Sequence, residues 1–315
     1  MSDIAIIGAG MAGLACATRL AASGRSVVLF DKGRGPGGRM ATRRAEVNGK
    51  TVRFDHGAQY FTVRDPAFIE AVANWRKAGA VASWPAAGKE ALVGTPGMNA
   101  PLRRMAEALK VHWGTRVQTL SRNDICWQLS FEGDRPAEQF AQVVVAIPAE
   151  QAADLLAEAA PDWSGQAAAS TSQPCWALMA SFAEKLPLND VFQDSDIAWA
   201  ARGASKPGRD AGEHWVIHAS PQWSQTFLEL APETAAVALL ARFCELAGIP
   251  KRVPVHSAAH RWRYAMAEKP ANGGNASPML WDKDKGLGVC GDWLANPRVE
   301  GAWVSGDSLA RTIEG

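Results

Sequence analysis

The chain of 315 residues is 47% hydrophobic and 21% charged, a composition typical of a soluble globular protein of about two domains. Its formal net charge of +1 and the lack of a basic run argue against binding to nucleic acid. No stretch approaches the ~18 consecutive apolar residues of a membrane-spanning helix. The five cysteines are scattered without a CxxC pair, which indicates neither disulfides nor a metal site and predicts a cytoplasmic protein.

The first residues of the chain have the pattern of a βαβ unit. Residues 4–7 are an apolar run, as expected of a strand buried on both faces, and residues 14–22 have the spacing of a helix that ends at Gly24. Residues 27–30 predict a second buried strand, which is followed by Asp31. Between the first strand and the helix lies the loop Gly8-Ala9-Gly10-Met11-Ala12-Gly13.

Each glycine of this loop suits the binding of a dinucleotide. Gly8 permits the tight turn, Gly10 lets the backbone approach a pyrophosphate, and Gly13 lets the helix pack closely on the sheet. The N-terminus of the helix offers N–H groups to phosphates. Asp31, 23 positions after Gly8, is placed to accept hydrogen bonds from ribose hydroxyls. The loop therefore predicts dinucleotide binding, without distinguishing NAD from FAD.

The middle of the chain predicts helices, loops and strands in alternation. Helical patterns cover residues 66–78, 97–110, 149–160 and 231–247, and strand-like runs cover residues 116–120, 125–131, 142–147 and 253–264. Loops are predicted at 33–44 and 272–275, and short β-like runs with many Trp at 174–230. We expect the two ends of the chain to share one sheet. The predicted domains are therefore a discontinuous FAD-binding domain (1–58, 97–150 and 281–315) and a substrate domain (59–96 and 151–280).

Two further signatures favour FAD over NAD. Gly37-Gly38-Arg39 follows Asp31, where glycines let an extended cofactor pass beneath the loop and Arg39 is placed to bind its pyrophosphate. Gly291-Asp292 ends a last buried strand at 287–290, where the carboxylate suits a ribityl hydroxyl. The N-terminus of a final helix at 299–312 would then face the pyrimidine ring of the flavin and favour the negative charge of its reduced form.

These motifs resemble those of the flavin amine oxidase superfamily and, more closely, those of the bacterial renalases. The resemblance covers almost the whole chain, and its most specific strings are Gly57-Ala58-Gln59-Tyr60-Phe61-Thr62 and Arg298-Val299-Glu300-Gly301-Ala302-Trp303. It implies an α/β fold with a Rossmann-like FAD-binding domain and a second, α+β substrate domain, similar to p-hydroxybenzoate hydroxylase and monoamine oxidase. It also implies that FAD is bound noncovalently.

The resemblance further implies an activity: oxidation of the 2- and 6-dihydro isomers of NAD(P)H to NAD(P)+, with dioxygen as acceptor and hydrogen peroxide as product. A dihydropyridine expels its hydride with its own nitrogen lone pair, so we predict no catalytic side chain. The expected partners are a dihydronicotinamide nucleotide and dioxygen, and the expected assembly is a monomer or a weak homodimer. An FAD-dependent amine oxidase and a non-catalytic flavin redox sensor are the alternatives.

The candidate site residues fall into two groups. Those predicted to bind FAD are Gly8, Gly10, Met11, Ala12, Gly13, Asp31, Lys32, Gly38, Arg39, Met40, Gly57, Ala58, Gln59, Gly291, Asp292, Arg298, Val299, Glu300 and Ala302. Those predicted to contact substrate are Gln59, Tyr60, Phe61, Trp176, Arg202, Trp223 and Tyr264. His214, His218 and His260 are predicted to be structural rather than functional.

Overall fold

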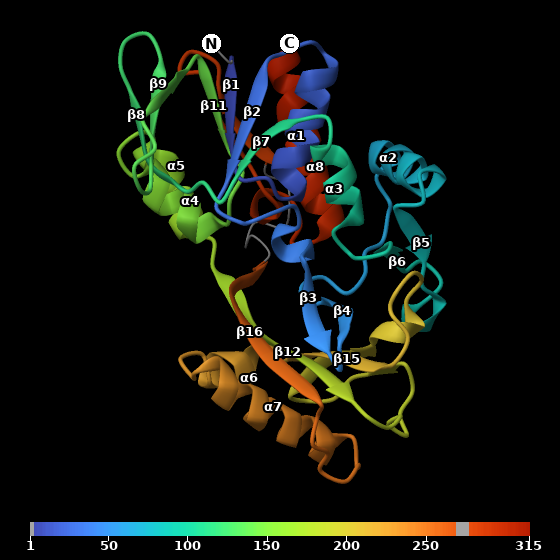
Figure 1. The fold of residues 1–315 in the computed structure, drawn as a ribbon. Helices are drawn as coiled ribbons and strands as arrows, with labels where there is room; N and C mark the ends of the chain where they lie inside the picture. The colour runs from blue at the N-terminus through green and yellow to red at the C-terminus, as the bar shows by residue number, and fades with distance from the viewer. Residues whose placement is uncertain (1–2, 269–276) are drawn as a thin grey trace.

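The computed structural model describes residues 3–268 and 277–315, so the loop predicted at 272–275 lies outside the described residues. One half of the molecule is built on a six-stranded sheet in the order β17-β18-β11-β1-β2-β7 (Figure 1). Its strands are β1 (Ile4–Ile7), β2 (Val27–Asp31), β7 (Lys110–Trp113), β11 (Gln142–Val145), β17 (Met279–Asp282) and β18 (Leu287–Cys290). Neighbours pair in parallel, except that β17 is antiparallel to β18. The two ends of the chain thus share one sheet.

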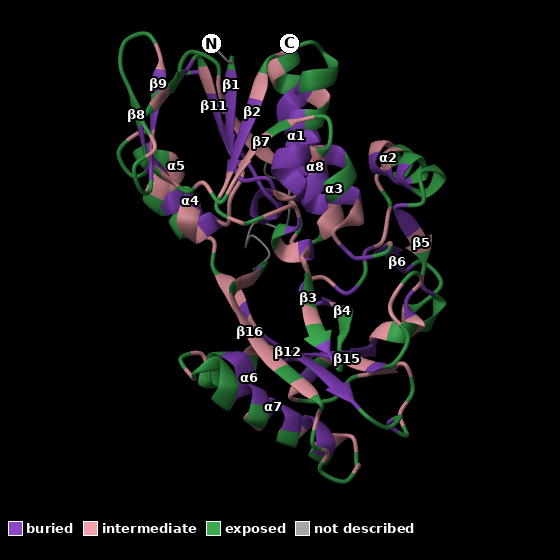
Figure 2. Ribbon diagram, in the orientation of Figure 1, coloured by how far each residue is buried: buried purple, intermediate pink, exposed green. Residues whose placement is uncertain are grey.

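Both faces of this sheet are covered, which explains why its central strands are apolar throughout and buried in Figure 2. One face packs against α1 (Met11–Ala22), α3 (Ala100–Ala106) and α8 (Val299–Glu314). The other face packs against α4 (Ala149–Leu156), α5 (Pro161–Ala168) and a three-stranded sheet of β8 (Val117–Arg122), β9 (Trp127–Phe131) and β10 (Glu138–Phe140).

The other half is built on a five-stranded antiparallel sheet in the order β13-β14-β15-β12-β16. Its strands are β12 (Ser172–Phe182), β13 (Val191–Phe192), β14 (Ile197–Arg202), β15 (Glu213–Ala219) and β16 (His256–Ala267). One face is covered by α6 (Pro221–Thr226) and α7 (Pro232–Leu246), and the other by the hairpin of β3 (Thr42–Val47) and β4 (Lys50–Asp55). In Figure 1, β12 and β16 extend from this sheet toward the first one.

The remaining elements complete the two halves. They are α2 (Pro66–Lys77), the hairpin of β5 (Val81–Ser83) and β6 (Leu92–Gly94), and four short 3₁₀ helices at Gly38–Met40, Pro85–Ala87, Gly203–Ser205 and Asp292–Leu294. Among the described residues, no helix combines the length and the apolar character needed to cross a bilayer.

The predicted α/β fold with a second α+β half is confirmed, and three predicted elements are corrected. The helix predicted at 97–110 ends at Ala106, and Lys110 already begins β7 at the edge of the main sheet. The helix predicted at 149–160 ends at Leu156, and a second helix begins at Pro161, directly after the predicted range. The loop predicted at 33–44 gives way at Thr42 to β3. The domain boundaries stay a prediction.

Candidate cofactor and substrate site

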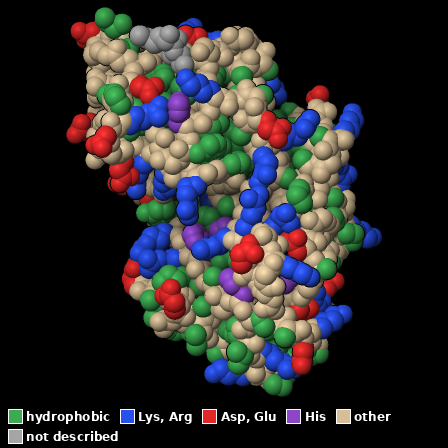
Figure 3. Space-filling model, in the orientation of Figure 1, with side chains coloured by type: hydrophobic (Ala, Val, Ile, Leu, Met, Phe, Trp, Pro, Cys, Tyr) green, Lys and Arg blue, Asp and Glu red, His purple; other side chains and the backbone are tan. Residues whose placement is uncertain are grey.

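A cavity of about 2140 Å³ lies between the carboxyl ends of the parallel strands and the five-stranded sheet. Its wall is formed by the loops that follow β1, β2, β11 and β18, and by residues of β12, β14, β15 and β16. Common small-molecule pockets measure roughly 300–1,000 Å³, so this cavity has room for an extended dinucleotide together with a substrate. Figure 3 shows Lys and Arg side chains gathered around a hollow in this face, with histidine inside it.

The glycine loop after β1 forms one end of the cavity. Gly8 has φ +103°, and a Cβ on Gly13 would lie 2.0 Å from the Gly8 carbonyl oxygen, so these two glycines shape the loop and its contact with α1. Gly10 is different, because it lines the cavity and a Cβ there would meet no described atom within 4 Å. Gly10 is also the N-cap residue of α1. The backbone therefore offers an open cradle to a pyrophosphate, as a dinucleotide requires.

Asp31 fixes the shape of this cradle as well as lining it. One carboxylate oxygen accepts a hydrogen bond of 2.6 Å from the Ala9 backbone N–H, and the other accepts one of 2.6 Å from the Gly33 N–H. Its neighbour Lys32 also lines the cavity and donates to Gln151 Oε1 at 2.8 Å. A ribose contact by Asp31 stays a prediction. The structure shows in addition that Asp31 links the first glycine loop to the loop after β2 through these two hydrogen bonds.

An ion pair joins the two ends of the chain at the middle of the cavity wall. Arg39 Nη1 and Nη2 donate to Asp292 Oδ2 and Oδ1 at 2.8 and 2.5 Å, a two-bond arrangement between residues that lie far apart in the sequence. Asp292 is buried and Arg39 is one-third exposed. Both line the cavity, so each remains a candidate for cofactor contact.

The N-terminus of α8 borders the same part of the cavity. Arg298, Val299, Glu300 and Ala302 all line it. Glu300 is anchored elsewhere, because its Oε1 accepts hydrogen bonds from the backbone N–H groups of Arg64 and Asp65. Glu300 therefore holds the loop before α2 against α8. The positive end of the α8 dipole lies at this wall, as the sequence predicts for stabilising a reduced flavin.

The residues around the sheet end of the cavity include three histidines and two tryptophans that are not among the predicted substrate contacts. They are His56, His218, His260, Trp199 and Trp262. His218 and His260 were predicted to be structural, and they line the cavity instead of lying away from it. His56 and Trp262 were not singled out, because they come from distant positions and share no local spacing with the others. The one available signal was the position of His56 directly before the family string that begins at Gly57.

These aromatic side chains pack around the backbone of His56. The His56 carbonyl oxygen accepts a hydrogen bond from Trp262 Nε1 at 2.8 Å and lies 3.1 Å from His218 Nε2. The His56 ring stacks on Trp262 with centroids 5.1 Å apart, and His260 meets the same indole edge-on at 4.4 Å. Tyr60 lies against Trp199 at 5.2 Å, and Tyr264 also lines the cavity. The result is a wall of flat rings.

The histidines of this wall are neutral at pH 7. Burial, together with the nearby charges of His260 and Arg43, lowers the pKa of His56 to about 4. Burial also lowers the pKa of His218 to about 4, and burial and Arg43 lower that of His260. The wall therefore offers uncharged rings rather than imidazolium cations.

Three predicted substrate residues do not line the cavity, and they are no longer candidates for substrate contact. Trp176 is fully buried in the core beneath α6 and α7, where its Nε1 donates to the Phe227 carbonyl oxygen at 2.9 Å. Trp223 packs in the same core. The Arg202 guanidinium is buried in a network with Glu213 and Asp190, with Nε 3.0 Å from Glu213 Oε2. These side chains are committed to packing and to internal ion pairs.

The other predicted residues lie as follows. Gly13 lies behind the glycine loop and outside the cavity lining, in accord with its packing role, while Tyr60 and Phe61 lie on the wall. Gln59 is also on the wall, but its amide is used internally, because Nε2 donates to the carbonyl oxygens of Asp55 and Gly57. Gln59 could therefore contact a ligand only through the atoms that line the cavity and are not used in these hydrogen bonds. All other predicted residues line the cavity.

Removing the Asp292 carboxylate tests its place in the cofactor site. In Asp292→Ala, a hydrogen-bond acceptor is lost and Arg39 is left without its partner, so the affinity for FAD should fall by about 1–3 kcal/mol, roughly a 5- to 150-fold rise in Kd. Fluorescence titration of the apoprotein with FAD measures this, with Asp282→Ala as control, because Asp282 is partly exposed and lies outside the cavity lining. An unchanged Kd in Asp292→Ala would remove Asp292 from the site.

Comparison with known proteins identifies the class. Residues 78–313 match the family described as flavin containing amine oxidoreductase, and residues 6–74 match the NAD(P)-binding Rossmann-like domain. Because the first match covers most of the chain, the protein belongs to the flavin-containing amine oxidoreductase family and is a flavin oxidoreductase.

Solved structures share the fold over nearly the whole chain. A protein from Exiguobacterium sp. 255-15 with the provisional name protoporphyrinogen oxidase matches with a TM-score of 0.78 and 13% identity, covering 99% of this chain and 98% of that one. A triple mutant of putrescine oxidase matches with a TM-score of 0.74, 16% identity and the same coverages. Cyclohexylamine oxidase from Brevibacterium oxydans IH-35A matches with 0.64, 14% identity and 100% of both chains. At these identities the likeness shows the fold and not the substrate.

Proposed function

We propose that this protein is an FAD-dependent oxidase of the renalase type, which converts 2- and 6-dihydro isomers of NAD(P)H to NAD(P)+. The observation that carries this proposal is the charge of the cavity wall. The lining residues between 173 and 266, all within the described part of the chain, include Arg261, Arg263, His218 and His260 but no carboxylate. Glu229, outside the lining, pairs with both arginines, at 2.9 Å from Arg261 and 2.7 Å from Arg263, so these three residues keep one net positive charge. A protonated amine would meet this charge and neutral rings there, whereas the phosphates of a nucleotide would be attracted to it.

The hairpin β3–β4 adds further arginines to the cavity wall. Arg43, Arg44 and Arg53 all line the cavity, and Arg44 lies directly opposite Arg53 across the hairpin. Like charges in that position destabilise a hairpin, and Asp210 offsets Arg53 through a contact of 2.8 Å. Arg43 is close enough to His56 and His260 to lower the pKa of both. These arginines support a substrate that carries phosphate groups.

The uncharged rings of the wall suit hydride transfer from a dihydropyridine. When bound, FAD would accept the hydride at N5 and pass two electrons to dioxygen, so that substrate, O₂ and one proton give NAD(P)+ and H₂O₂. The chain's own task is to orient a flat ring and to exclude water. His56, His218 and Trp262 provide flat, neutral surfaces that are fixed by the hydrogen bonds to the His56 carbonyl oxygen. No side chain needs to remove a proton from the substrate.

The cavity also supports noncovalent binding of the cofactor. The one cysteine among the described lining residues is Cys175, and burial raises the pKa of its thiol to about 12. A thiol with this pKa stays protonated at neutral pH and is a poor nucleophile toward a flavin. We therefore infer that FAD is held by the glycine loops, Arg39 and Asp292 rather than by a covalent bond.

An amine oxidase is the second candidate, and one specific observation favours it. The family match and two of the similar structures carry amine oxidase names, and Tyr60 with Trp199 places two aromatic rings on the wall. The planes of these rings are tilted by 43°, so they do not form two parallel walls around an amine. The absence of a carboxylate from the described wall between 173 and 266 weighs further against a cationic substrate.

Anaerobic stopped-flow mixing separates the two candidates. We expect 6-dihydro-NAD and 2-dihydro-NAD to bleach the flavin absorbance at least about 100-fold faster than ordinary NADH or primary amines, a difference of ~3 kcal/mol in activation free energy. Admission of dioxygen should then restore the colour and release one hydrogen peroxide per flavin. Rapid bleaching by an amine, with none by the dihydro isomers, would replace the proposed activity with amine oxidation. Slow reduction by every donor would indicate a redox sensor.

A further inference from the structure

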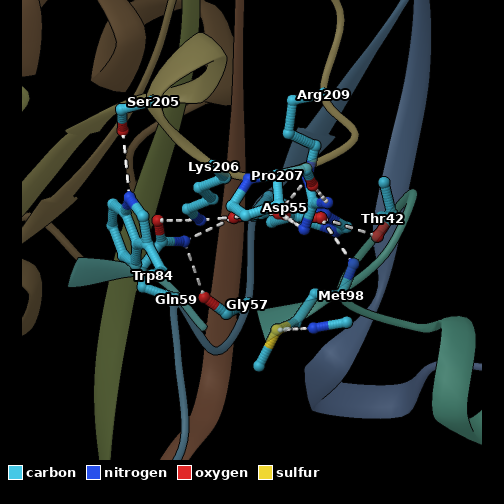
Figure 4. A network of polar contacts seen from close by, with 12 residues as sticks. Thr42, Asp55, Gly57, Gln59, Trp84, Met98, Ser205, Lys206, Pro207 and Arg209 are labelled. Carbon is cyan, nitrogen blue, oxygen red and sulfur yellow. Dashed lines mark hydrogen bonds and ion pairs between the residues drawn. The ribbon is translucent and has the colours of Figure 1, made fainter. Parts of the chain in front are cut away.

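A buried group of charges lies directly behind the cavity wall at residues 55–59. We call it the Asp55 cluster; its members are Asp55, Gln59, Lys206 and Arg209. Figure 4 shows Lys206 and Arg209 reaching Asp55 from the loop that follows β14. The side chains of Asp55, Lys206 and Arg209 are each at most 3% exposed. The cluster thus links the five-stranded half of the molecule to β4 and to the wall of the cavity.

Asp55 is satisfied without Lys206. Its Oδ1 accepts hydrogen bonds from Thr42 Oγ1 at 2.7 Å and from the Met98 N–H at 2.9 Å. Its Oδ2 accepts two from Arg209, at 2.9 and 2.7 Å. Lys206 Nζ is the most distant partner, at 3.4 Å. Asp55 and Arg209 therefore form a balanced, hydrogen-bonded pair, and Lys206 adds a second positive charge that the stability of Asp55 does not require.

An unbalanced charge in a protein interior is costly, and an apolar residue of similar size is often more stabilising. Lys206 is only 4% exposed and packs over the Trp84 ring, with Nζ 4.9 Å from the ring centroid. Its shorter polar contact is with the wall rather than with Asp55, because Nζ donates to Gln59 Oε1 at 3.0 Å. Gln59 lines the cavity. The excess charge is therefore held one side chain away from the space where the cofactor is to bind.

We propose that Lys206 is a positioning residue whose buried charge, held behind Gln59, favours the negatively charged reduced state of the flavin bound against this wall. A positive charge near a flavin stabilises the reduced form relative to the oxidised form. The low dielectric of the interior strengthens this effect over short distances. This role adds to that of the α8 dipole, since Lys206 acts from the opposite half of the molecule. The inference rests on flavin binding and not on the proposed substrate.

The titration of Lys206 gives the proposal a second signature. Burial lowers the pKa of Lys206 to about 8, with Asp55 opposing and Arg209 assisting this shift. The titratable and charged groups that face it are Asp55 of β4, Arg209 of its own loop and the neutral His218 of β15. Lys206 is therefore mostly charged at pH 7 and loses its charge above pH 8. The stabilisation of reduced flavin should disappear over the same range.

Reduction potentials of the bound flavin test the proposal without any substrate. They are measured at pH 7 by slow enzymatic reduction with a reference dye. In Lys206→Met the reduced-to-oxidised ratio at fixed potential should fall about tenfold, equivalent to ~30 mV for a two-electron couple. Lys206→Arg, which keeps the charge, should remain close to the wild type. Lys285→Met, the same change at a half-exposed lysine outside the cavity, is the matched control.

Each outcome of this experiment is informative. A folded Lys206→Met protein with the wild-type potential would overturn the proposal. A merely structural role would instead change thermal stability and FAD retention and leave the potential of the retained flavin unaltered. If Lys206→Met does not fold, the comparison moves to wild type and Lys206→Arg between pH 7 and 9.5. The reduction potential of the wild type should then fall more steeply with pH than that of Lys206→Arg, because Lys206 loses its charge in this range and arginine does not. Equal slopes would reject the proposal.

Discussion

A Gly10→Val protein should fold normally and yet be colourless, with its affinity for FAD reduced about 100-fold or more, equivalent to ~3 kcal/mol. The reason is the open space in front of this residue. Gly10 lines the cavity, and a Cβ there meets no described atom within 4 Å, so the valine side chain would occupy the path of the pyrophosphate without disturbing the fold. Flavin absorbance after reconstitution, together with a thermal unfolding curve of the apoprotein, measures both effects.

Two other glycines provide the controls for this variant. Gly165→Val also introduces a side chain that meets no described atom, but outside the cavity lining, so it should bind FAD normally. Gly13→Val should instead destabilise the protein itself, because its Cβ would lie 2.0 Å from the Gly8 carbonyl oxygen. A yellow, stoichiometrically loaded Gly10→Val protein would show that the first glycine loop does not hold the pyrophosphate.

The parts of the fold that could be predicted are those where one local pattern decides the structure. The runs at 4–7, 27–30 and 142–147 are apolar because their strands are buried on both faces, and they pair with one another in the sheet. The glycine motifs predicted that the two ends of the chain meet, and the ion pair of Arg39 with Asp292 shows this contact directly. Both signals depend on backbone constraints, which act within a few residues.

The β3–β4 hairpin could have been predicted but was hidden by its charges. Its inner face carries Ala45, Val47, Val52 and Phe54, but Arg43 lies opposite Phe54 on this same face and interrupts the alternation. The turn signal was present, because Asn48 has φ 50° and Gly49 follows it. A composition rich in Gly and Arg suggested a loop, whereas the pairing with β4 decides the structure.

The ring wall and the Asp55 cluster could not be predicted from the sequence. His56, His218 and Trp262 meet only because β4, β15 and β16 converge in space, and nothing in their spacing indicates this. Arg202 and Lys206 show the same limit, because the sequence does not distinguish their roles. Both are cations near β14, yet one is balanced by two carboxylates and the other carries the excess charge behind the cavity. Only the tertiary partners distinguish them.

The buried histidines also predict how the protein responds to acid. His56 and His218 have pKa values near 4 in the folded state, against 6.5 in an unfolded chain. Both are therefore protonated more readily when unfolded. The stability that they contribute is complete above pH 6.5 and is lost as the pH falls toward 4. The free energy of unfolding should fall by about 3 kcal/mol per histidine over this window, since one pKa unit corresponds to ~1.4 kcal/mol. The pKa of Asp55 is lowered, so the stability that its carboxylate contributes is lost only below this pH window.

Denaturant unfolding of the Gly10→Val apoprotein at pH 7, 5.5 and 4.5 measures this loss without a contribution from FAD binding. His218→Gln retains a donor for the His56 carbonyl oxygen but does not titrate, so its stability should fall by about half as much as that of the parent. His112→Gln is the histidine control outside the cavity lining, because His112 is partly exposed and lies at the edge strand β7. If His218→Gln loses stability as steeply as its parent, then His218 takes up its proton in the folded state and the wall is not neutral at low pH. The cavity would then become more cationic on acidification, and the binding of an anionic substrate would strengthen rather than stay constant between pH 7 and 5.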